Sequence, residues 1–193
     1  MAVSQIQARW QEQSAMIRPA KLRGKIFVLL GAGSWLNSAM LRRIQRGKNR
    51  ARGGLFAVVA SRYNSEYVDA MLRAAREELL RAGARVRIVR VPGAFEIPAA
   101  AARLAQPRRY SAIICLGVVF QGETSHAQHI GWGVTHALAQ IQVRHKIPVI
   151  HGVFVFEKPK LARVRCLGKK HNRGTEAAQT ALEMARVMKK IGA

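Results

Sequence analysis

From residue 54 onward, apolar runs alternate with segments whose apolar residues recur every three or four positions. Continuous apolar runs indicate strands covered on both faces, and a spacing of three to four is typical of amphipathic helices. The pattern predicts strands over 55–60, 86–91, 111–120 and 148–156, and helices over 66–82, 95–104, 126–143 and 175–191. Strands that alternate with helices predict an α/β fold, in which a central parallel sheet carries helices on both faces.

Ligands of such sheets bind beyond the carboxyl ends of the strands. The loops that follow the predicted strands are therefore candidate site segments: 62–65, 92–96, 121–126 and 156–158. The third belongs to the stretch GVVFQGETSH (117–126), which reads as a strand end, a tight turn and the first turn of a helix.

A helix start carries unpaired N–H groups and a partial positive charge, so this junction is a candidate anion site. The same stretch ends in His126. Imidazole is the side chain most easily used as an acid or base near neutral pH. The stretch therefore predicts an anion pocket with a proton-transfer group beside it.

Residues 1–53 do not follow this pattern and end in the basic run RRIQRGKNRARGG. We expect them to form a flexible basic extension that precedes a single domain over 54–193. Their one apolar stretch, Lys25–Leu30, is far shorter than the ~20 apolar residues of a membrane helix, so no membrane association is expected. Two other interpretations stay open at this point: an Arg-rich organelle transit peptide, and a translation start farther downstream.

The chain has 33 Lys and Arg against 10 Asp and Glu, a formal net charge of +23. Both parts are basic, with +10 in residues 1–52 and +13 in residues 53–193. Such a charge favours anionic partners and predicts nonspecific binding to polyanions. The two cysteines, Cys115 and Cys166, have neither metal-site spacing nor the number of a disulfide scaffold, which favours a reducing compartment such as the cytoplasm.

Four segments carry a resemblance to a known family: SRYN (61–64), VPGAFEIP (91–98), GVVFQGETSH (117–126) and RCLGKKHNRGTEAA (165–178). In this order and spacing, residues 54–191 resemble the 6,7-dimethyl-8-ribityllumazine synthases of riboflavin biosynthesis. The resemblance implies a flavodoxin-like three-layer sandwich that forms pentamer-based assemblies. It also implies a condensation of 5-amino-6-(D-ribitylamino)uracil with 3,4-dihydroxy-2-butanone 4-phosphate, without cofactor or metal.

The resemblance also implies a role for each matching residue. His126 corresponds to the catalytic histidine, and Glu123, Thr124 and Arg165 correspond to the groups that bind the butanone phosphate. The uracil and ribityl group would contact Tyr63, Ala94, Phe95, Glu96, Val118, Val119, Phe120 and His151. Lys169 and Arg173 match basic positions near the site. Structural roles compete with these: Thr124 or Ser125 can cap a helix, Glu96 can be a first-turn acid, and Tyr63 can simply pack.

The chain departs from the family pattern at several positions. Gln121 replaces a common arginine, His151 replaces an aromatic residue, Trp132-Gly133 replaces Asn-Glu, and Val155–Phe156 replaces two threonines. The expected partners are the two substrates, riboflavin synthase, and further copies of the chain in pentamers, decamers or sixty-subunit shells, with sites between subunits. A competing hypothesis is a non-catalytic or weakly active member of the fold that assembles and binds polyanions.

Overall fold

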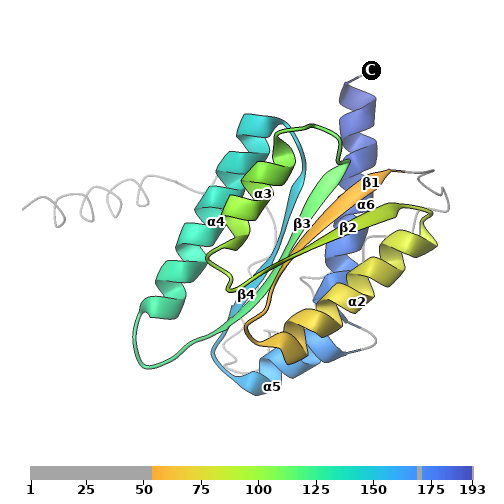
Figure 1. Cartoon of the computed structure of the whole chain (residues 1–193). Coiled ribbons are helices and arrows are strands. Elements are labelled where there is room, and N and C mark those ends of the chain that lie inside the picture. Colours follow the sequence, from red (N-terminus) through yellow and green to blue (C-terminus); the bar gives the residue numbers. More distant parts are fainter. Residues whose placement is uncertain (1–53, 169–170, 193) are drawn as a thin grey trace, which may run out of the picture. The chain divides into compact units, whose positions relative to one another are not determined.

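The computed structural model describes residues 54–168 and 171–192. Its centre is a four-stranded parallel sheet with the strand order β2-β1-β3-β4 (Figure 1). The strands are β1 (Leu55–Ser61), β2 (Arg85–Val91), β3 (Ala112–Phe120) and β4 (Val149–Phe156). The helical elements are α2 (Ser65–Arg81), α3 (Ile97–Ala105), α4 (His126–His145), α5 (Pro159–Ala162), η1 (Arg163–Leu167) and α6 (Arg173–Ile191). The predicted α/β class and parallel sheet are confirmed.

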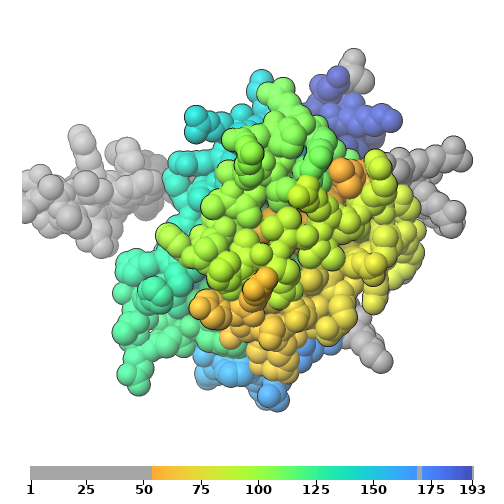
Figure 2. Space-filling view, in the orientation of Figure 1, coloured from red at the N-terminus to blue at the C-terminus, as the bar shows by residue number. Residues whose placement is uncertain are grey.

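The helices form a layer on each face of the sheet (Figure 1). Alternate side chains of each strand point to opposite faces, so the two central strands supply two separate cores. Phe56, Val58 and Leu116 pack toward α2 and α6, whereas Ala57 and Cys115 pack toward α3 and α4. In Figure 2 only small orange patches from the start of the described chain remain visible, because β2, α2 and α3 lie in front of the rest. The two central strands are therefore buried, as their apolar runs predict, whereas the edge strand β2 is largely exposed or half-buried.

The register extends β3 beyond the end of β1. The β1–β3 ladder ends at the pair Ala60 and Leu116, whereas the β3–β4 ladder continues to Phe120 and Phe156. Residues 117–120 therefore have a ladder partner only on the β4 side. Because N–H and C=O groups alternate between the two sides of a strand, part of this backbone faces away from β4 and is open to other partners.

The segment between β4 and α6 contains helical turns that the sequence pattern did not predict. It forms α5 and then a single π-helical turn, η1, whose Cys166 is buried in the core beside α2 and α6. The last helix begins at Arg173 instead of Thr175, because the Asn172 side chain accepts a hydrogen bond from the Gly174 N–H and caps it. Short turns without a full apolar period leave no signal of their own.

Helices α2 and α6 approach each other closely near the start of α6. A Cβ atom at Gly174 would lie 1.9 Å from the Met71 carbonyl oxygen of α2, so only glycine fits there. Farther along, the buried Glu78 carboxylate of α2 accepts a hydrogen bond from the Gln179 side chain of α6 at 3.2 Å and pairs with Arg81. Among the described residues, no helix is long and apolar enough to cross a membrane. The predicted extension 1–53 and its Lys25–Leu30 stretch lie outside these residues.

Candidate active site

The loops that follow β1 and β2 are joined at the carboxyl edge of the sheet. The N–H of Arg62 donates to the Val91 carbonyl at 2.8 Å, and the N–H of Tyr63 donates to the Pro92 carbonyl at 3.1 Å. A Cβ at Gly93 would lie 3.1 Å from the Tyr63 ring, so the ring rests against the glycine backbone. The sequence places these loops 30 residues apart, and the parallel topology brings them together.

Two aromatic rings at this edge are unusually exposed. Tyr63 is 70% exposed and Phe95 is 64% exposed, whereas Ala94 between the loops is buried at 7%. The Glu96 carboxylate accepts a hydrogen bond from the Gly93 N–H at 2.9 Å, which closes the loop that carries Phe95. Exposed rings on a loop held by a hydrogen bond can stack on a planar ligand at little cost in conformational entropy. Glu96 thus has a structural role, and its second oxygen is still available to a ligand.

The end of β3 presents backbone groups to the site and directs its side chains elsewhere. Val118 is buried in the core beneath α2, and the Phe120 ring meets Tyr67 edge to face at 5.4 Å between centroids. The Asn64 side-chain amide donates to the Val118 carbonyl at 2.8 Å. Val119 faces the α3 and α4 layer. In the part that extends beyond β1, the backbone of this strand end is open to the pyrimidine contact that the sequence predicted for it.

The GETSH turn leads into α4 without a side-chain cap. Ser125 occupies the N-cap position, but its hydroxyl pairs with His129 Nε2 at 3.0 Å instead of with a helix N–H. The capping role considered for Thr124 or Ser125 is therefore wrong. Because no side chain caps this helix start within the described structure, its N–H groups are available to an anion.

His126 is the first residue of α4, directly after the turn, and its side chain is exposed. His129 lies one helical turn later. Residues three apart share a helix face, so two imidazoles flank this end of α4. From the sequence we chose His126 but not His129. The available signal for His129 was its position three residues farther along the same predicted helix.

His151 lies on the edge strand β4 and contacts α4. Its Nε2 is 2.8 Å from the Thr135 hydroxyl, and that hydroxyl donates its hydrogen to the Gly131 carbonyl at 2.7 Å. A hydroxyl has one hydrogen to give, so the Nε2 must carry the hydrogen of the second bond. Desolvation lowers the pKa of His151 below its usual range, which favours the neutral imidazole. The sequence did not indicate Thr135, because its contact with His151 arises only when α4 packs on β4.

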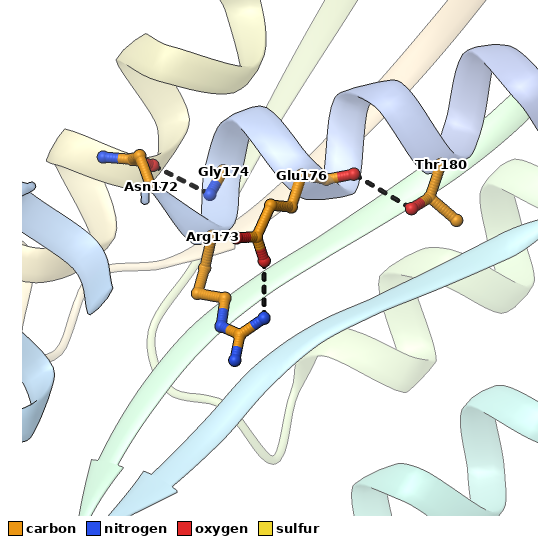
Figure 3. A network of polar contacts seen from close by, with 5 residues as sticks. All are labelled: Asn172, Arg173, Gly174, Glu176 and Thr180. Atoms are coloured by element: carbon orange, nitrogen blue, oxygen red, sulfur yellow. Dashed lines mark hydrogen bonds and ion pairs between the residues drawn. The ribbon is translucent and has the colours of Figure 1, made fainter. Parts of the chain in front are cut away.

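Arg165 lies on η1, which packs against α2 and α6. Nearby on η1, Arg163 forms a side-chain hydrogen bond with Tyr67, and this bond raises the pKa of the Arg163 guanidinium. The Arg173 guanidinium pairs with Glu176 at 2.5 Å (Figure 3). It also lies 5.6 Å from the Phe154 ring centroid, so structural contacts already occupy it. The other basic position singled out in the sequence, Lys169, lies outside the described residues.

The fold assembles most of the predicted site residues at one edge of the sheet, whereas His151 lies away from this edge and Arg165 lies toward the other face of the sheet. The group at the carboxyl edge follows β1, β2 and β3 and comprises Tyr63, Ala94, Phe95, Glu96, Val118, Val119, Phe120, Glu123, Thr124 and His126. His151 precedes the end of β4 by five residues, about 16 Å at the rise of a strand. Arg165 belongs to the helical layer on the α2 and α6 face, opposite α4.

Asn64 is a further residue of the site that sequence reasoning named only as part of a motif. Its backbone is left-handed at φ 55°, it precedes α2, and its side chain fixes the end of β3. Asparagine tolerates this conformation better than other residues with a side chain, so a polar turn with asparagine just before a helix was the available signal.

Comparison with known proteins gives one consistent result. The family model described as 6,7-dimethyl-8-ribityllumazine synthase matches residues 54–189. A protein of that name from Stenotrophomonas maltophilia is 37% identical over 139 residues, which are 70% of this chain and 90% of the relative. One from Xanthomonas campestris pv. campestris is 38% identical over 145 residues, 74% of this chain and 94% of the relative. With the parallel sheet and the loops assembled at its carboxyl edge, these matches show that the chain belongs to the 6,7-dimethyl-8-ribityllumazine synthase family.

Proposed function

We propose that the chain condenses 5-amino-6-(D-ribitylamino)uracil with 3,4-dihydroxy-2-butanone 4-phosphate, releasing phosphate and water, as a lumazine synthase of riboflavin biosynthesis. The observation that carries this proposal is the uncapped GETSH turn with His126 at its end, beside two exposed aromatic rings. That edge offers a flat surface for a pyrimidine, N–H groups for a phosphate and an imidazole for proton transfer.

The chemistry needs proton transfers at each step. An amine of the uracil adds to the ketone, and loss of water gives an imine. Phosphate then leaves, and the second amine closes the ring with loss of water. His126 is the general acid and base for these transfers, because its exposed imidazole stands at the phosphate turn. Positioning of the two substrates supplies much of the remaining acceleration.

The phosphate is held by the turn and by a guanidinium. The turn that carries Glu123 and Thr124 leads into the start of α4, where the helix dipole favours negative charge. Arg165 contributes bidentate hydrogen bonds of the kind that phosphate accepts. The same donors stabilise the charge that grows on the phosphate as it leaves.

The separation of His151 and Arg165 from the rest of the site supports an assembly of several copies. Arg165 lies on the α2 and α6 face, and His126 begins a helix of the other face. We propose that each site takes His126, Tyr63 and Phe95 from one copy and His151 and Arg165 from its neighbour in a pentamer-based assembly. In place of an aromatic ring, the neutral His151 imidazole then covers the pyrimidine.

Turnover of the two substrates by the purified full chain, without added metal or cofactor, tests the activity. His126→Ala should lower kcat by about a hundredfold, the usual contribution of one general acid–base group. Arg165→Ala should raise the KM of the phosphorylated ketone and leave that of the uracil within about twofold, since a lost charged hydrogen bond costs ~2 kcal/mol. An unchanged ketone KM in Arg165→Ala would remove Arg165 from the phosphate site.

Mixed assemblies test whether neighbours share a site. Co-expressed His126→Ala and Arg165→Ala chains should recover activity, because random pairing returns intact residues to about a quarter of the shared sites. Activity that stays at the average of the two variants would place both residues in one copy.

The family resemblance also predicts partners beyond the substrates. The product of this reaction feeds riboflavin synthase, so we propose association with that enzyme in the cytoplasm. Light scattering of the purified chain, alone and mixed with riboflavin synthase, measures both the size of the assembly and the association.

A further inference from the structure

Gln121 connects the end of β3 to both the neighbouring strand and the GETSH turn. Its backbone N–H donates to the Phe156 carbonyl of β4 at 2.9 Å. Its side-chain nitrogen donates to the carbonyl of Gly122 at 3.0 Å and to that of Thr124 at 2.8 Å. Two carbonyl acceptors need the two hydrogens of the amide nitrogen, so these contacts also fix which way the amide faces.

These two bonds determine where the N–H groups of the turn point. The C=O and N–H groups of a trans peptide unit point in opposite directions. When the Gly122 and Thr124 carbonyls face Gln121, the N–H groups of Glu123 and Ser125 are turned to the opposite side. Both residues are exposed, and within the described structure neither N–H donates to a backbone carbonyl. A pair of N–H groups aimed the same way is a binding element for an oxyanion.

We infer that Gln121 is a positioning residue for the phosphate of the ketone substrate. It never touches the phosphate; it holds two carbonyls away from the anion and so directs two N–H groups toward it. This inference rests on the proposed function of the turn. It adds a residue whose effect is exerted through the backbone of its neighbours.

The physical reason is that a turn residue without such a restraint can rotate its peptide planes. A carbonyl oxygen that rotated toward the phosphate would present a partial negative charge and repel it. The turn is exposed from Gly122 to His126, and a Cβ built at Gly122 would meet no atom within 4 Å apart from the adjacent residues of the chain, so packing does not restrict rotation there. The hydrogen bonds from Gln121 therefore supply the restraint that packing does not.

The test compares variants of Gln121 in the full chain by steady-state kinetics and by inhibition with inorganic phosphate. Gln121→Met keeps the length of the side chain but cannot donate. We expect it to raise the KM of the phosphorylated ketone and the inhibition constant of phosphate by about tenfold, which corresponds to ~1.4 kcal/mol. The KM of the uracil should stay within twofold, since that substrate contacts other loops. Gln121→Arg retains donors that reach the carbonyls and should stay near the unmodified chain.

Gln128→Met is the matched control, because Gln128 is exposed on the first turn of α4 and makes no bond to the turn. It should leave all three constants unchanged. Equal constants in Gln121→Met and the unmodified chain would overturn the inference, as would equal losses in the methionine and arginine variants. A parallel rise in both substrate constants would also overturn it, since that indicates a general structural defect. If the unmodified chain turns over neither substrate and phosphate does not inhibit it, the proposed function itself fails.

Discussion

At the scale of single residues, the site depends on side chains that arrange backbone groups. Asn64 binds the Val118 carbonyl, Gln121 binds two carbonyls of the turn, and Glu96 binds the Gly93 N–H. Each bond joins a loop to itself or to the next strand end. The motifs in the sequence indicated these positions, but the partners follow from the register of the strands and could not be read from the sequence.

Asn64 should stabilise the fold through both its backbone and its amide. Asn64→Gly keeps access to the left-handed backbone at φ 55° but loses the bond to Val118, so we expect a loss of about 1 kcal/mol in the free energy of unfolding. Asn64→Ala loses the bond and also strains the backbone, so its loss should be about 2 kcal/mol. Urea unfolding of both variants measures this difference. If alanine proves as stable as glycine, the left-handed strain has no measurable cost here.

His151 should make the stability of the chain depend on pH. Its pKa in the folded chain is lowered by desolvation, so the unfolded chain binds a proton at a higher pH than the folded chain. The contribution is complete above the unfolded value, about 6.5, and is lost as the pH falls toward the folded value. Thermal unfolding between about pH 5 and 8 should therefore show a shallower decline at low pH in His151→Phe than in the unmodified chain.

The other histidines of α4, including His126, His129 and His136, are common to both proteins, so the difference between the two curves isolates His151. Thr135→Val is a second comparison, because it removes the hydroxyl that receives the Nε2 hydrogen. Parallel curves for the unmodified chain and His151→Phe would show that the imidazole is not desolvated.

At the scale of elements, the long periodic segments were predicted well and the short turns were not. Strand β3 and helix α4 follow their apolar patterns almost to the residue, because burial requires the pattern. The turns α5 and η1 escaped prediction, since they have too few residues for a period. The site followed the same division. The sequence motifs indicated candidate residues, whereas the placement of Arg165 on the opposite face from His126 depended on these unpredicted turns.

The contact between α2 and α6 should be the most sensitive point of the fold. Gly174→Ala would bring a methyl group to 1.9 Å from the Met71 carbonyl, so α6 would have to shift. We expect a loss of at least about 2 kcal/mol, the usual cost of overpacking a close contact. Gly133→Ala is the control, because its Cβ would lie at an ordinary 3.6 Å from the Phe95 ring. It should be neutral or up to about 1 kcal/mol more stable through helix propensity. Equal melting temperatures for the two variants would contradict this account.

At the scale of the whole molecule, the helix ends at the amino edge of the sheet are basic. Helices that connect parallel strands end there, and the last turns of α2, α3, α4 and α6 carry the basic residues Arg81, Arg103, Arg144, His145, Lys189 and Lys190. Two more arginines, Arg87 and Arg109, converge on the Tyr110 hydroxyl at 3.2 and 3.1 Å. This edge lies opposite the loops of the candidate active site, so a polyanion bound at this edge would leave the site open.

The net charge should therefore produce salt-sensitive binding to polyanions that is separate from catalysis. The full chain has a formal charge of +23, of which residues 1–52 contribute +10. We expect it to be retained on heparin and to elute at a salt concentration that falls when residues 1–52 are deleted, because each contact with the polyanion releases counterions. In the remaining domain, replacing Lys189 and Lys190 with glutamine should lower that concentration further and leave turnover unchanged, whereas Arg165→Ala should lower turnover. No retention at low salt, or retention that salt does not weaken, would contradict charge-driven binding.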